Sequence, residues 1–409
     1  MASQTDAKYA DYRDPDPFTV HAHDHEFTFY PGGKDRLDAL IEHIGSAKKT
    51  LKCFYFEYDE DDAGAKVRDA LADAARRGVE VSLYIDAVGS TAKPPFFEVL
   101  QEAGGTFDRF QADVSKRALI RNHQKMVIVD NERVMAGGFN ITDGYFSTAK
   151  DNGWKDLGVK ITGPIVQRYT DWYACIEKWI ETDGSEFRLI REMVRDWDSE
   201  DGPVRLIMGG PTSVTSEWVV RFKEDLARTK RRDIVTAYFA PPRSVRRVLR
   251  RAAKTGQMRM ILASKSDFAI TVLAARIHYR RLVRAGTRLF EYQPSKLHMK
   301  LMVLDDICYF GSGNLDMRSV RLNLEIMLRV EDAGMAAKLR EVIDDMEQVS
   351  RPVDKSWFRQ YAGWTDKVRW LVSSFMLRFV DYKLSRKLNL GPSKLKNASI
   401  THKGERADD

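Results

Sequence analysis

One internal repeat constrains the fold of this chain more than any other feature of its sequence. Residues 47–86 have the pattern of a strand, an amphipathic helix and a second strand, and residues 232–264 show the same order. Each helix ends at a glycine, Gly78 or Gly256, a residue that commonly terminates helices. Each unit then continues into a further helix, a glycine turn and an apolar strand. This alternation predicts α/β layers with largely buried sheets.

The repeat predicts an α/β protein with two α/β/α repeats related by a pseudo-twofold axis, because 409 residues suit two domains of moderate size. A stretch rich in glycine, proline and acidic residues near 198–213 marks the expected seam. The expected boundaries are, in order, an N-terminal extension at 1–24, the first repeat at 25–197, the second repeat at 204–350, a C-terminal amphipathic helix at 356–390 and a disordered tail at 391–409.

The apolar strand that closes each repeat carries the same polar motif, HxKxxxxD. The motif residues are His123, Lys125 and Asp130 in the first copy and His298, Lys300 and Asp305 in the second. Residues i and i+2 of a strand point to the same face, so the histidine and the lysine of each copy should project together. Two copies of this motif, each preceded by a matching strand–helix unit, favour a functional site over an ordinary amphipathic strand.

A glycine-rich hairpin follows each motif and returns a further polar group to the same region. The first copy reads AGGFN and ends in Asn140, while the second reads FGSGN and contains Ser312 and Asn314. We expect these three side chains to bind phosphate oxygens, because amides and hydroxyls donate hydrogen bonds to anions. Each copy thus supplies an imidazole, an ammonium and an amide on one side of the sheet.

Two such copies facing each other would form a cradle for a tetrahedral phosphodiester. The two lysines and the two amides can neutralise and orient its oxygens, which otherwise repel a nucleophile. One neutral imidazole can attack phosphorus and form a covalent phosphohistidine. The other, when protonated, can donate its proton to the departing alkoxide and then deprotonate the incoming hydroxyl. This chemistry requires no metal, and we expect neither a metal nor another cofactor.

Four carboxylates are candidates for orienting the two imidazoles. Asp156 and Glu325 follow their motifs on further predicted strands, and each could accept a hydrogen bond from an imidazole N–H. Asp130 and Asp305 belong to the motif and are counted here with the catalytic set. They sit at strand ends, however, and a structural role on the backbone or the neighbouring turn is the favoured interpretation for both.

At these residues the chain resembles the phospholipase D superfamily, whose signature is a duplicated HxKxxxxD with a following GSxN. The resemblance covers about residues 25–350, and the text RNHQK, WKDLGVKITGP and FGSGNLDMRSVRLNLE is similar to bacterial cardiolipin synthases. It implies transfer of a phosphatidyl group from one phosphatidylglycerol to the glycerol hydroxyl of another, giving cardiolipin and glycerol. It also implies that His123 is the nucleophile and His298 the general acid and base, although the near-symmetry of the site leaves this order open.

Two alternatives to this activity remain at the level of the sequence. Water could replace the acceptor alcohol, which would give a phospholipase D that forms phosphatidic acid. A phosphodiesterase acting on nucleic acid would use the same chemistry. The chain departs from the superfamily pattern at Gly138, where serine is frequent, and this departure predicts that one hydroxyl contact to phosphate is missing from the first half.

The C-terminal segment favours a lipid over a nucleic acid. Most of the net charge of +7 lies in residues 356–409, and apolar residues recur at three-to-four spacing from Trp357 to Tyr382. A basic helix with Trp and Phe on its apolar side is typical of an interfacial helix on anionic lipid. Packing of the same stripe onto the protein body is the alternative. We therefore expect a phospholipid substrate, an anionic membrane surface as partner through 356–390, and no nucleic acid.

The remaining features set the expected compartment. The N-terminal residues are polar and do not have the pattern of a secretory signal. The sequence also has no apolar stretch of about 20 residues, the length expected of a membrane-spanning helix. The three cysteines lie far apart without a CxxC pair, which fits a reducing compartment. The HAHDH sequence at 21–25 lacks zinc-site spacing, and the arginine-rich stretches are interpreted as solvated helix faces. The expected location is the cytoplasm, peripheral on the inner face of a bacterial cell membrane, with the oligomeric state left open.

Overall fold

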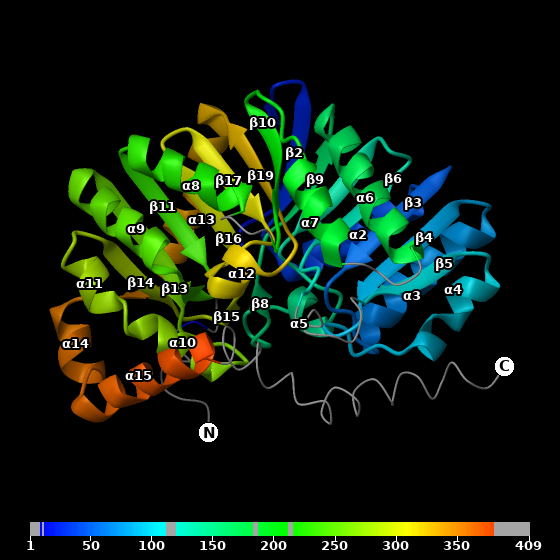
Figure 1. The fold of residues 1–409 in the computed structure, drawn as a ribbon. Helices are drawn as coiled ribbons and strands as arrows, with labels where there is room; N and C mark the ends of the chain where they lie inside the picture. The colour runs from blue at the N-terminus through cyan, green and yellow to red at the C-terminus, as the bar shows by residue number, and fades with distance from the viewer. Residues whose placement is uncertain (1–8, 10–11, 112–119, 183–186, 212–215, 380–409) are drawn as a thin grey trace.

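Two eight-stranded mixed sheets form the body of the protein in the computed structural model (Figure 1). The structure describes residues 9, 12–111, 120–182, 187–211 and 216–379. The first sheet contains, in spatial order, β1 (Phe18–Ala22), β2 (His25–Tyr30), β9 (Gly158–Thr162), β7 (Arg133–Gly137), β6 (Lys125–Val129), β3 (Thr50–Tyr55), β4 (Glu80–Asp86) and β5 (Thr106–Phe110). The second contains, in spatial order, β10 (Val204–Gly209), β19 (Glu325–Glu331), β17 (Ile307–Gly311), β16 (Lys300–Leu304), β11 (Arg231–Thr236), β13 (Gln257–Ala263), β14 (Arg288–Tyr292) and β20 (Ser350–Pro352).

The pairing of the strands shows the duplication. In each sheet the motif strand, β6 or β16, is antiparallel to the first strand of its strand–helix unit, β3 or β11. On its other side it is antiparallel to the next strand along the chain, β7 or β17. Parallel pairs then extend the sheet from β3 through β4 to β5, and from β11 through β13 to β14. The prediction of a duplicated α/β fold is confirmed.

Helices cover both sheets. Those of the first repeat are α2 (Gly33–Gly45), α3 (Asp62–Arg76), the 3-10 helix η1 (Pro94–Phe97), α4 (Glu98–Glu102), α5 (Asp143–Phe146), α6 (Ile165–Glu181) and α7 (Phe187–Asp196). Those that follow are α8 (Glu217–Arg228), α9 (Arg243–Thr255), α10 (Ala269–Arg276), α11 (Tyr279–Val283), α12 (Met317–Arg321), α13 (Ala333–Gln348), α14 (Lys355–Tyr361) and α15 (Trp364–Phe379).

The largest core lies between the two sheets and joins the repeats. Buried residues of α6, such as Trp172, and of α13, such as Leu339, belong to one cluster with residues of both sheets. Phe310 of β17 contacts the rings of Phe27 and Phe29 in β2, which belong to the other repeat. Because burial of apolar surface is the main force that holds folded elements together, the two repeats form one unit.

Local sequence explains the position of the motif strands. All five residues of β6, KMVIV, and of β16, KLMVL, are buried, as expected for strands covered on both faces. The preceding helix α3 begins where Asp61 accepts a hydrogen bond from the Gly64 N–H, and it is followed by Gly78 at φ +87°. Gly256 after α9 is extended instead, and a Cβ there would lie 2.3 Å from the Lys230 carbonyl oxygen.

The two ends of the described chain differ from the expected boundaries. The proposed extension at 1–24 contains β1, which pairs with β2 at the edge of the first sheet. The helix expected at 356–390 is interrupted between Tyr361 and Trp364 and forms two helices, α14 and α15, so the prediction of one continuous helix is wrong. Gly363 lies in this break, and glycine is a poor helix former. Residues 380–409, including the proposed tail at 391–409, lie outside the described residues.

A short ladder joins the repeats beside the motif strands. Strand β8 (Trp154–Lys155) of the first repeat is parallel to β15 (Lys296–Leu297) of the second. A second short ladder joins β12 (Phe239–Ala240) and β18 (Leu315–Asp316) within the second repeat. Since β15 is followed directly by His298, the first ladder places one motif histidine against the other repeat.

Candidate active site

The two motif histidines meet at the boundary between the repeats. The ring centroids of His123 and His298 are 6.3 Å apart, and the two residues are only 7% and 3% exposed. The backbone of each histidine is held by the opposite repeat. The backbone N–H of His123 donates to the Leu324 carbonyl oxygen, and the backbone N–H of His298 donates to the Lys155 carbonyl oxygen. The two imidazoles therefore belong to one site that both repeats build.

The carboxylates that orient the imidazoles cross from one repeat to the other. His123 Nδ1 lies 3.0 Å from Glu325 Oε2, and His298 Nδ1 lies 2.7 Å from Asp156 Oδ2. Both carboxylates are buried. Because each carboxylate occupies Nδ1, Nε2 is the ring atom of each histidine that can meet a substrate. The sequence indicated these two carboxylates but not their exchange between the repeats.

Both lysines of the motif are buried beside the histidines. Burial is the largest effect on their ammonium groups, and it lowers the pKa of Lys125 to about 7 and that of Lys300 to about 8. Lys125 Nζ lies 2.5 Å from the His123 carbonyl oxygen, and Lys300 Nζ lies 2.8 Å from His298 Nδ1. Nδ1 of His298 cannot accept a hydrogen bond from Lys300 and donate one to Asp156 at the same time, so the two contacts belong to different tautomers of the imidazole.

The free site favours neutral imidazoles and ionised carboxylates. Burial lowers the pKa of both histidines, and with the added repulsion of Lys300 the pKa of His298 falls to about 3. Burial opposes ionisation of Asp156, but Lys300 and the hydrogen bond from His298 outweigh it and lower its pKa to about 2. Glu325 shows the same balance, with His123 and then Lys125 lowering its pKa. Either neutral imidazole is thus ready to act as a nucleophile.

The motif aspartates lie away from the imidazoles. Asp130 accepts hydrogen bonds from the backbone N–H groups of residues 48–50, and Asp305 accepts from those of residues 230 and 231. Each sits in a turn with positive φ, and five steps of extended chain at about 3.3 Å each separate Asp130 from Lys125. These contacts fit the structural role favoured by their place at strand ends, and a catalytic role for the two aspartates stays a prediction.

The expected phosphate-binding residues have other partners. Ser312 Oγ donates to Glu325 Oε2 at 2.5 Å and accepts from the Ile326 N–H, so its partner here is the carboxylate, and binding of phosphate stays a prediction. Asn140 Nδ2 donates to Glu57 Oε2 at 2.6 Å, and Asn314 Oδ1 accepts from the Tyr238 N–H at 3.4 Å. Both asparagines are buried close to the site.

Gly138 lies next to the Asp156 carboxylate. A Cβ atom at this position would lie 2.5 Å from Asp156 Oδ1. Gly138 thus lies beside Asp156, the carboxylate bonded to His298. In the same way, Ser312 lies beside Glu325, the carboxylate bonded to His123. A serine side chain at this position would press against Asp156, and the expected loss of a phosphate contact stays a prediction.

Several residues of the site were not singled out from the sequence. The rings of Tyr145, Trp154 and Tyr238 lie 5.1, 5.4 and 5.9 Å from the ring of His298 and form an aromatic wall. Phe56 contacts His123 at 4.8 Å. Glu57 is half-buried beside Asn140, and burial followed by repulsion from Asp59 raises its pKa to about 7. The sequence signal that could have identified Glu57 is a charged residue within the otherwise apolar stretch FYFEY.

Comparisons with known proteins agree with this geometry. The fold and the paired histidines define the chain as an enzyme of the phospholipase D class. The family model described as "Cardiolipin synthase, PLD-like domain" matches residues 40–174 and 223–347, and the chain belongs to this family.

Two curated relatives and one solved structure illustrate the similarity. Cardiolipin synthase A of Pseudomonas fluorescens (strain Pf-5) is 30% identical over 348 residues, which cover 80% of this chain and 70% of that protein. Cardiolipin synthase A of Pseudomonas aeruginosa (strain LESB58) is 30% identical over 76% of this chain and 65% of its own length, so the chain spans about two thirds of these relatives. The crystal structure of phosphatidylserine synthase from Haemophilus influenzae Rd KW20 has the same fold, with a TM-score of 0.69, 16% identity and coverage of 94% of this chain and 99% of that one.

The described residues contain neither a membrane-spanning helix nor a cluster of metal ligands. They include no helix with the length and apolar character needed to cross a bilayer. They also include no group of three or more His, Cys, Asp or Glu side chains placed to hold a metal ion. His23 and His25 of the HAHDH sequence instead bond within the fold, His23 to the Glu331 carbonyl oxygen and His25 to the Ile165 N–H.

Proposed function

We propose that the chain transfers a phosphatidyl group from one phosphatidylglycerol to the glycerol hydroxyl of a second, forming cardiolipin and glycerol. The observation that carries this proposal is the pair of histidines 6.3 Å apart, each held at Nδ1 by a carboxylate of the other repeat. This arrangement presents two Nε2 atoms to a single phosphorus, as a displacement with a nucleophile on one side and a proton donor on the other requires.

In the first half-reaction, Nε2 of His123 attacks the phosphorus of the donor lipid. The new N–P bond forms as the P–O bond to the leaving glycerol breaks, and His298 donates its proton to that oxygen. His298 must gain this proton on binding of substrate, because burial and Lys300 disfavour the imidazolium in the free site. A phosphodiester anion between Lys125 and Lys300 offsets the repulsion by the two ammonium groups and so raises the pKa of the imidazole.

In the second half-reaction, His298 removes the proton from the acceptor hydroxyl. The acceptor oxygen attacks phosphorus, the N–P bond breaks, and His123 returns to its neutral form. Glu325 and Asp156 do not touch the substrate in this scheme. They hold the rings through Nδ1 and stabilise the positive charge that each ring carries in turn.

The test is incubation of the protein with phosphatidylglycerol vesicles, followed by analysis of the lipids and of free glycerol. Cardiolipin with an equal amount of glycerol supports the proposal. Phosphatidic acid alone would mean hydrolysis, and cleavage of nucleic acid without any lipid product would mean a phosphodiesterase. His123→Ala and His298→Ala should each abolish turnover. His21→Ala is the matched control, because the His21 side chain is 73% exposed on β1 and should be dispensable.

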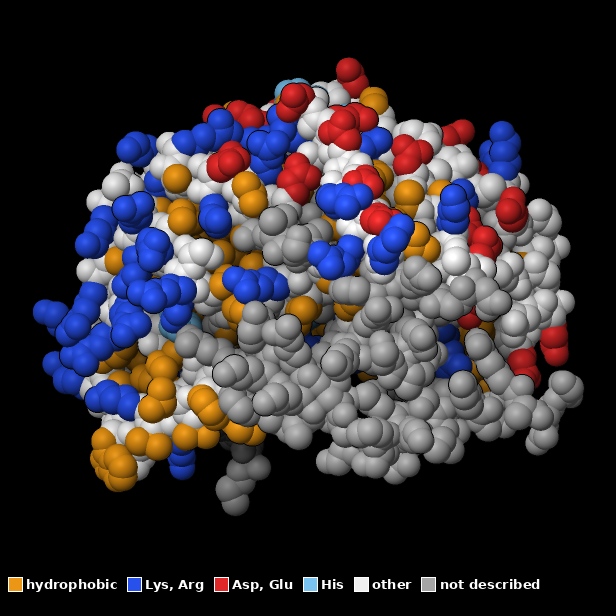
Figure 2. Space-filling view, in the orientation of Figure 1, with side chains coloured by type: hydrophobic (Ala, Val, Ile, Leu, Met, Phe, Trp, Pro, Cys, Tyr) orange, Lys and Arg blue, Asp and Glu red, His pale blue; other side chains and the backbone are white. Residues whose placement is uncertain are grey.

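We further propose that α15 places the protein on an anionic membrane. Six apolar side chains share one exposed face of this helix: Trp364, Val368, Leu371, Val372, Phe375 and Met376. The opposite face, with Trp370, Ser373 and Ser374, is buried, and α15 packs along α10. Figure 2 shows hydrophobic side chains gathered at the lower left edge of the molecule with Lys and Arg side chains above them. Apolar anchors beside cationic groups match an anionic lipid surface.

One part of the apolar stripe expected from the sequence is buried in the protein, and the other part is exposed. Trp357 of α14 is buried against the protein body, whereas the α15 positions face outward. The double variant Leu371→Ser/Phe375→Ser should weaken binding to phosphatidylglycerol vesicles in a flotation assay, because each large apolar side chain contributes about 1.5–3 kcal/mol when it is fully buried. Its melting temperature should match that of the unaltered protein. Unchanged flotation would refute the role of this face, and binding to neutral phosphatidylcholine vesicles as strong as that to anionic ones would refute the charge requirement.

A further inference from the structure

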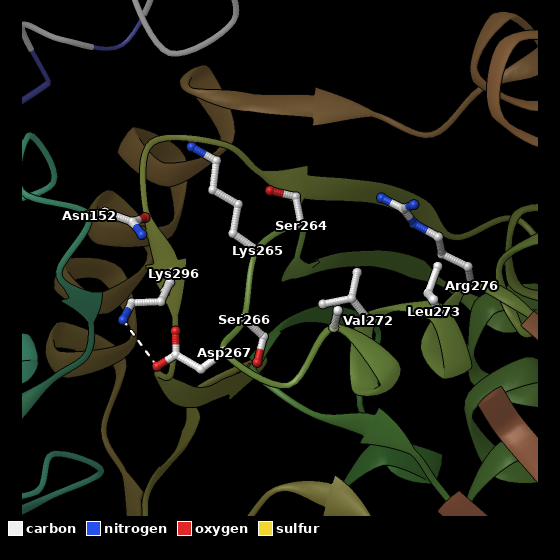
Figure 3. Close-up of a pocket in the computed structure, with 10 residues that line it drawn as sticks. Asn152, Ser264, Lys265, Ser266, Asp267, Val272, Leu273, Arg276 and Lys296 are labelled. Carbon is white, nitrogen blue, oxygen red and sulfur yellow. Dashed lines mark hydrogen bonds and ion pairs between the residues drawn. The ribbon is translucent and has the colours of Figure 1, made fainter. Parts of the chain in front are cut away.

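A pocket of about 460 Å³ lies beside the histidine that handles the acceptor (Figure 3). Val272 and Leu273 of α10 form its apolar side. Its polar side carries two lysines, two serines, one carboxylate and one amide: Lys265, Lys296, Ser264, Ser266, Asp267 and Asn152. Figure 3 shows Arg276 at the opposite end from Lys296. Arg276 is paired at 2.8 Å with Glu291, which is fully buried, whereas the partner of Lys296 is the more exposed Asp267, so Lys296 is the cation that a ligand in the polar part can recruit.

The pocket is close to His298. Lys296 Nζ lies 4.5 Å from the ring centroid of Trp154, and that ring lies 5.4 Å from the ring of His298. The Lys296 ammonium is therefore at most about 10 Å from the centre of the His298 ring. Tyr238 makes a second connection, because its hydroxyl bonds with Ser266 and its ring is 5.9 Å from that of His298.

We propose that this pocket binds the phosphate of the acceptor lipid, and the proposal rests on the transfer reaction proposed above. The reaction brings two phosphodiesters together, and the motif lysines account for only one of them. In the product the two phosphorus atoms are joined through one glycerol by six bonds. Such a chain spans about 7 Å, as two residues of extended backbone do. The second phosphate must therefore lie within this reach of the first, and the Lys296 ammonium is placed to receive it.

Lys296 is held for this role by a weak partner. Its Nζ is 3.1 Å from Asp267 Oδ2, and the Lys296 side chain is 15% exposed whereas that of Asp267 is 56% exposed. Because water reaches the carboxylate and screens its charge, a phosphate can displace Asp267 from the ammonium. A neutral acceptor offers no charge in exchange and leaves the pair intact. The pocket thus favours an anionic acceptor over water or a simple alcohol.

The apolar side of the pocket leads toward the exposed face of α15. Val272 and Leu273 belong to α10, which packs along α15, and Phe268 just before α10 is 65% exposed. Figure 1 shows α10 and α15 side by side. A lipid whose headgroup reaches Lys296 can therefore extend its acyl chains past Phe268 to the surface proposed to lie on the membrane. This path distinguishes a membrane lipid from a soluble phosphate.

The experiment measures how the covalent intermediate partitions between acceptors. Phosphatidylglycerol vesicles are incubated with the protein and a fixed concentration of 1-butanol, and the ratio of cardiolipin to phosphatidylbutanol is determined. Both products arise from the same intermediate, so the ratio is independent of how fast the intermediate forms. Lys296→Gln should lower this ratio at least tenfold, and Lys296→Arg should restore most of it. Lys338→Gln, which breaks an exposed ion pair with Glu341 on α13, is the matched control and should leave the ratio unchanged.

Three results would overturn the inference. The first is a ratio for Lys296→Gln within twofold of that of the unaltered protein. The second is an equal loss of the ratio in Lys338→Gln, which would mean a general effect of charge. The third uses glycerol 3-phosphate as a soluble competing acceptor, and its use in preference to phosphatidylglycerol, with the same sensitivity to Lys296→Gln, would assign the pocket to a free phosphomonoester. If the unaltered protein forms no phosphatidyl product with any acceptor, the proposed transfer reaction itself fails, which is a distinct outcome.

Discussion

Replacement of Glu325 by glutamine tests the crossed carboxylates most directly. Glu325 is fully buried and accepts hydrogen bonds from His123 Nδ1 at 3.0 Å, Ser312 Oγ at 2.5 Å and Ser319 Oγ at 2.7 Å. Glutamine has nearly the same shape but exchanges one acceptor oxygen for an N–H donor. One of the three donors then faces another donor, and a buried donor without a partner costs about 1–3 kcal/mol.

The larger effect of Glu325→Gln is on the reaction. A positive charge develops on the imidazole of His123 as its Nε2 bonds to phosphorus, and the carboxylate 3.0 Å from Nδ1 stabilises that charge. Hydrogen bonds to charged groups are worth about 1.5–3 kcal/mol, and each 1.36 kcal/mol is a factor of ten in rate. Loss of this bond together with misorientation of the ring should lower kcat by roughly 30-fold to 1000-fold. KM should change little, because Nδ1 points away from the substrate.

The assay is a single-turnover reaction, quenched at intervals, in which both the lipid product and phosphohistidine are measured. Glu325→Gln should slow the appearance of phosphohistidine. Asp156→Asn should slow both its formation and its breakdown, because His298 donates the proton in the first half-reaction and removes one in the second. A phosphoryl group found on His298 instead of His123 would make His298 the nucleophile. A kcat of folded Glu325→Gln within threefold of that of the unaltered protein would refute the positioning role of this carboxylate.

Three further outcomes are expected. The kcat/KM of transfer should fall as pH rises through about 7 to 8, because Lys125 and Lys300 then lose the charges that neutralise phosphate. Their pKa values are lowered to about 7 and about 8. A pH profile of kcat/KM that stays flat to about pH 9.5 would contradict this. Gly138→Ser should lower kcat at least tenfold in the lipid assay, because its Cβ would displace the Asp156 carboxylate, whereas increased activity would favour a missing phosphate contact. The pKa of buried His43 is lowered by burial from 6.5 to about 4, so the neutral ring contributes stability that is complete above pH 6.5 and is lost as pH falls toward 4. Urea unfolding should therefore show that His43→Gln loses less free energy of unfolding than the unaltered protein between pH 7 and pH 4, by up to about 3 kcal/mol, and an equal loss would count against this assignment.

The duplicated fold could be predicted because its signals are local. Strand and helix patterns repeat within about 40 residues, and the two-residue period of a strand places His123 beside Lys125. The crossed pairs could not be predicted in this way, because 202 residues separate His123 from Glu325 and 142 separate His298 from Asp156. Such contacts depend on how the two repeats pack, and the sequence of either repeat alone does not contain that information.

Two other features were beyond the sequence for related reasons. Ser312 was expected to bind phosphate because a hydroxyl can donate to any nearby oxygen, and only the fold shows that its neighbour is Glu325. The apolar stripe of the C-terminal helices fits equally well on a protein core or on a membrane. The spacing of Trp357 and Leu371 is compatible with one stripe, yet the break before α15 buries the first and exposes the second.

The exchange of carboxylates between the repeats has a consequence for the evolution of the duplicated gene. Two copies that each held a complete site could diverge freely, since damage to one would leave the other active. Here each histidine depends on a residue encoded in the other copy, so a substitution at Asp156 acts on the half that carries His298. Selection must therefore act on both halves together, and neither copy can be lost or exchanged for an unrelated domain without disabling the one that remains.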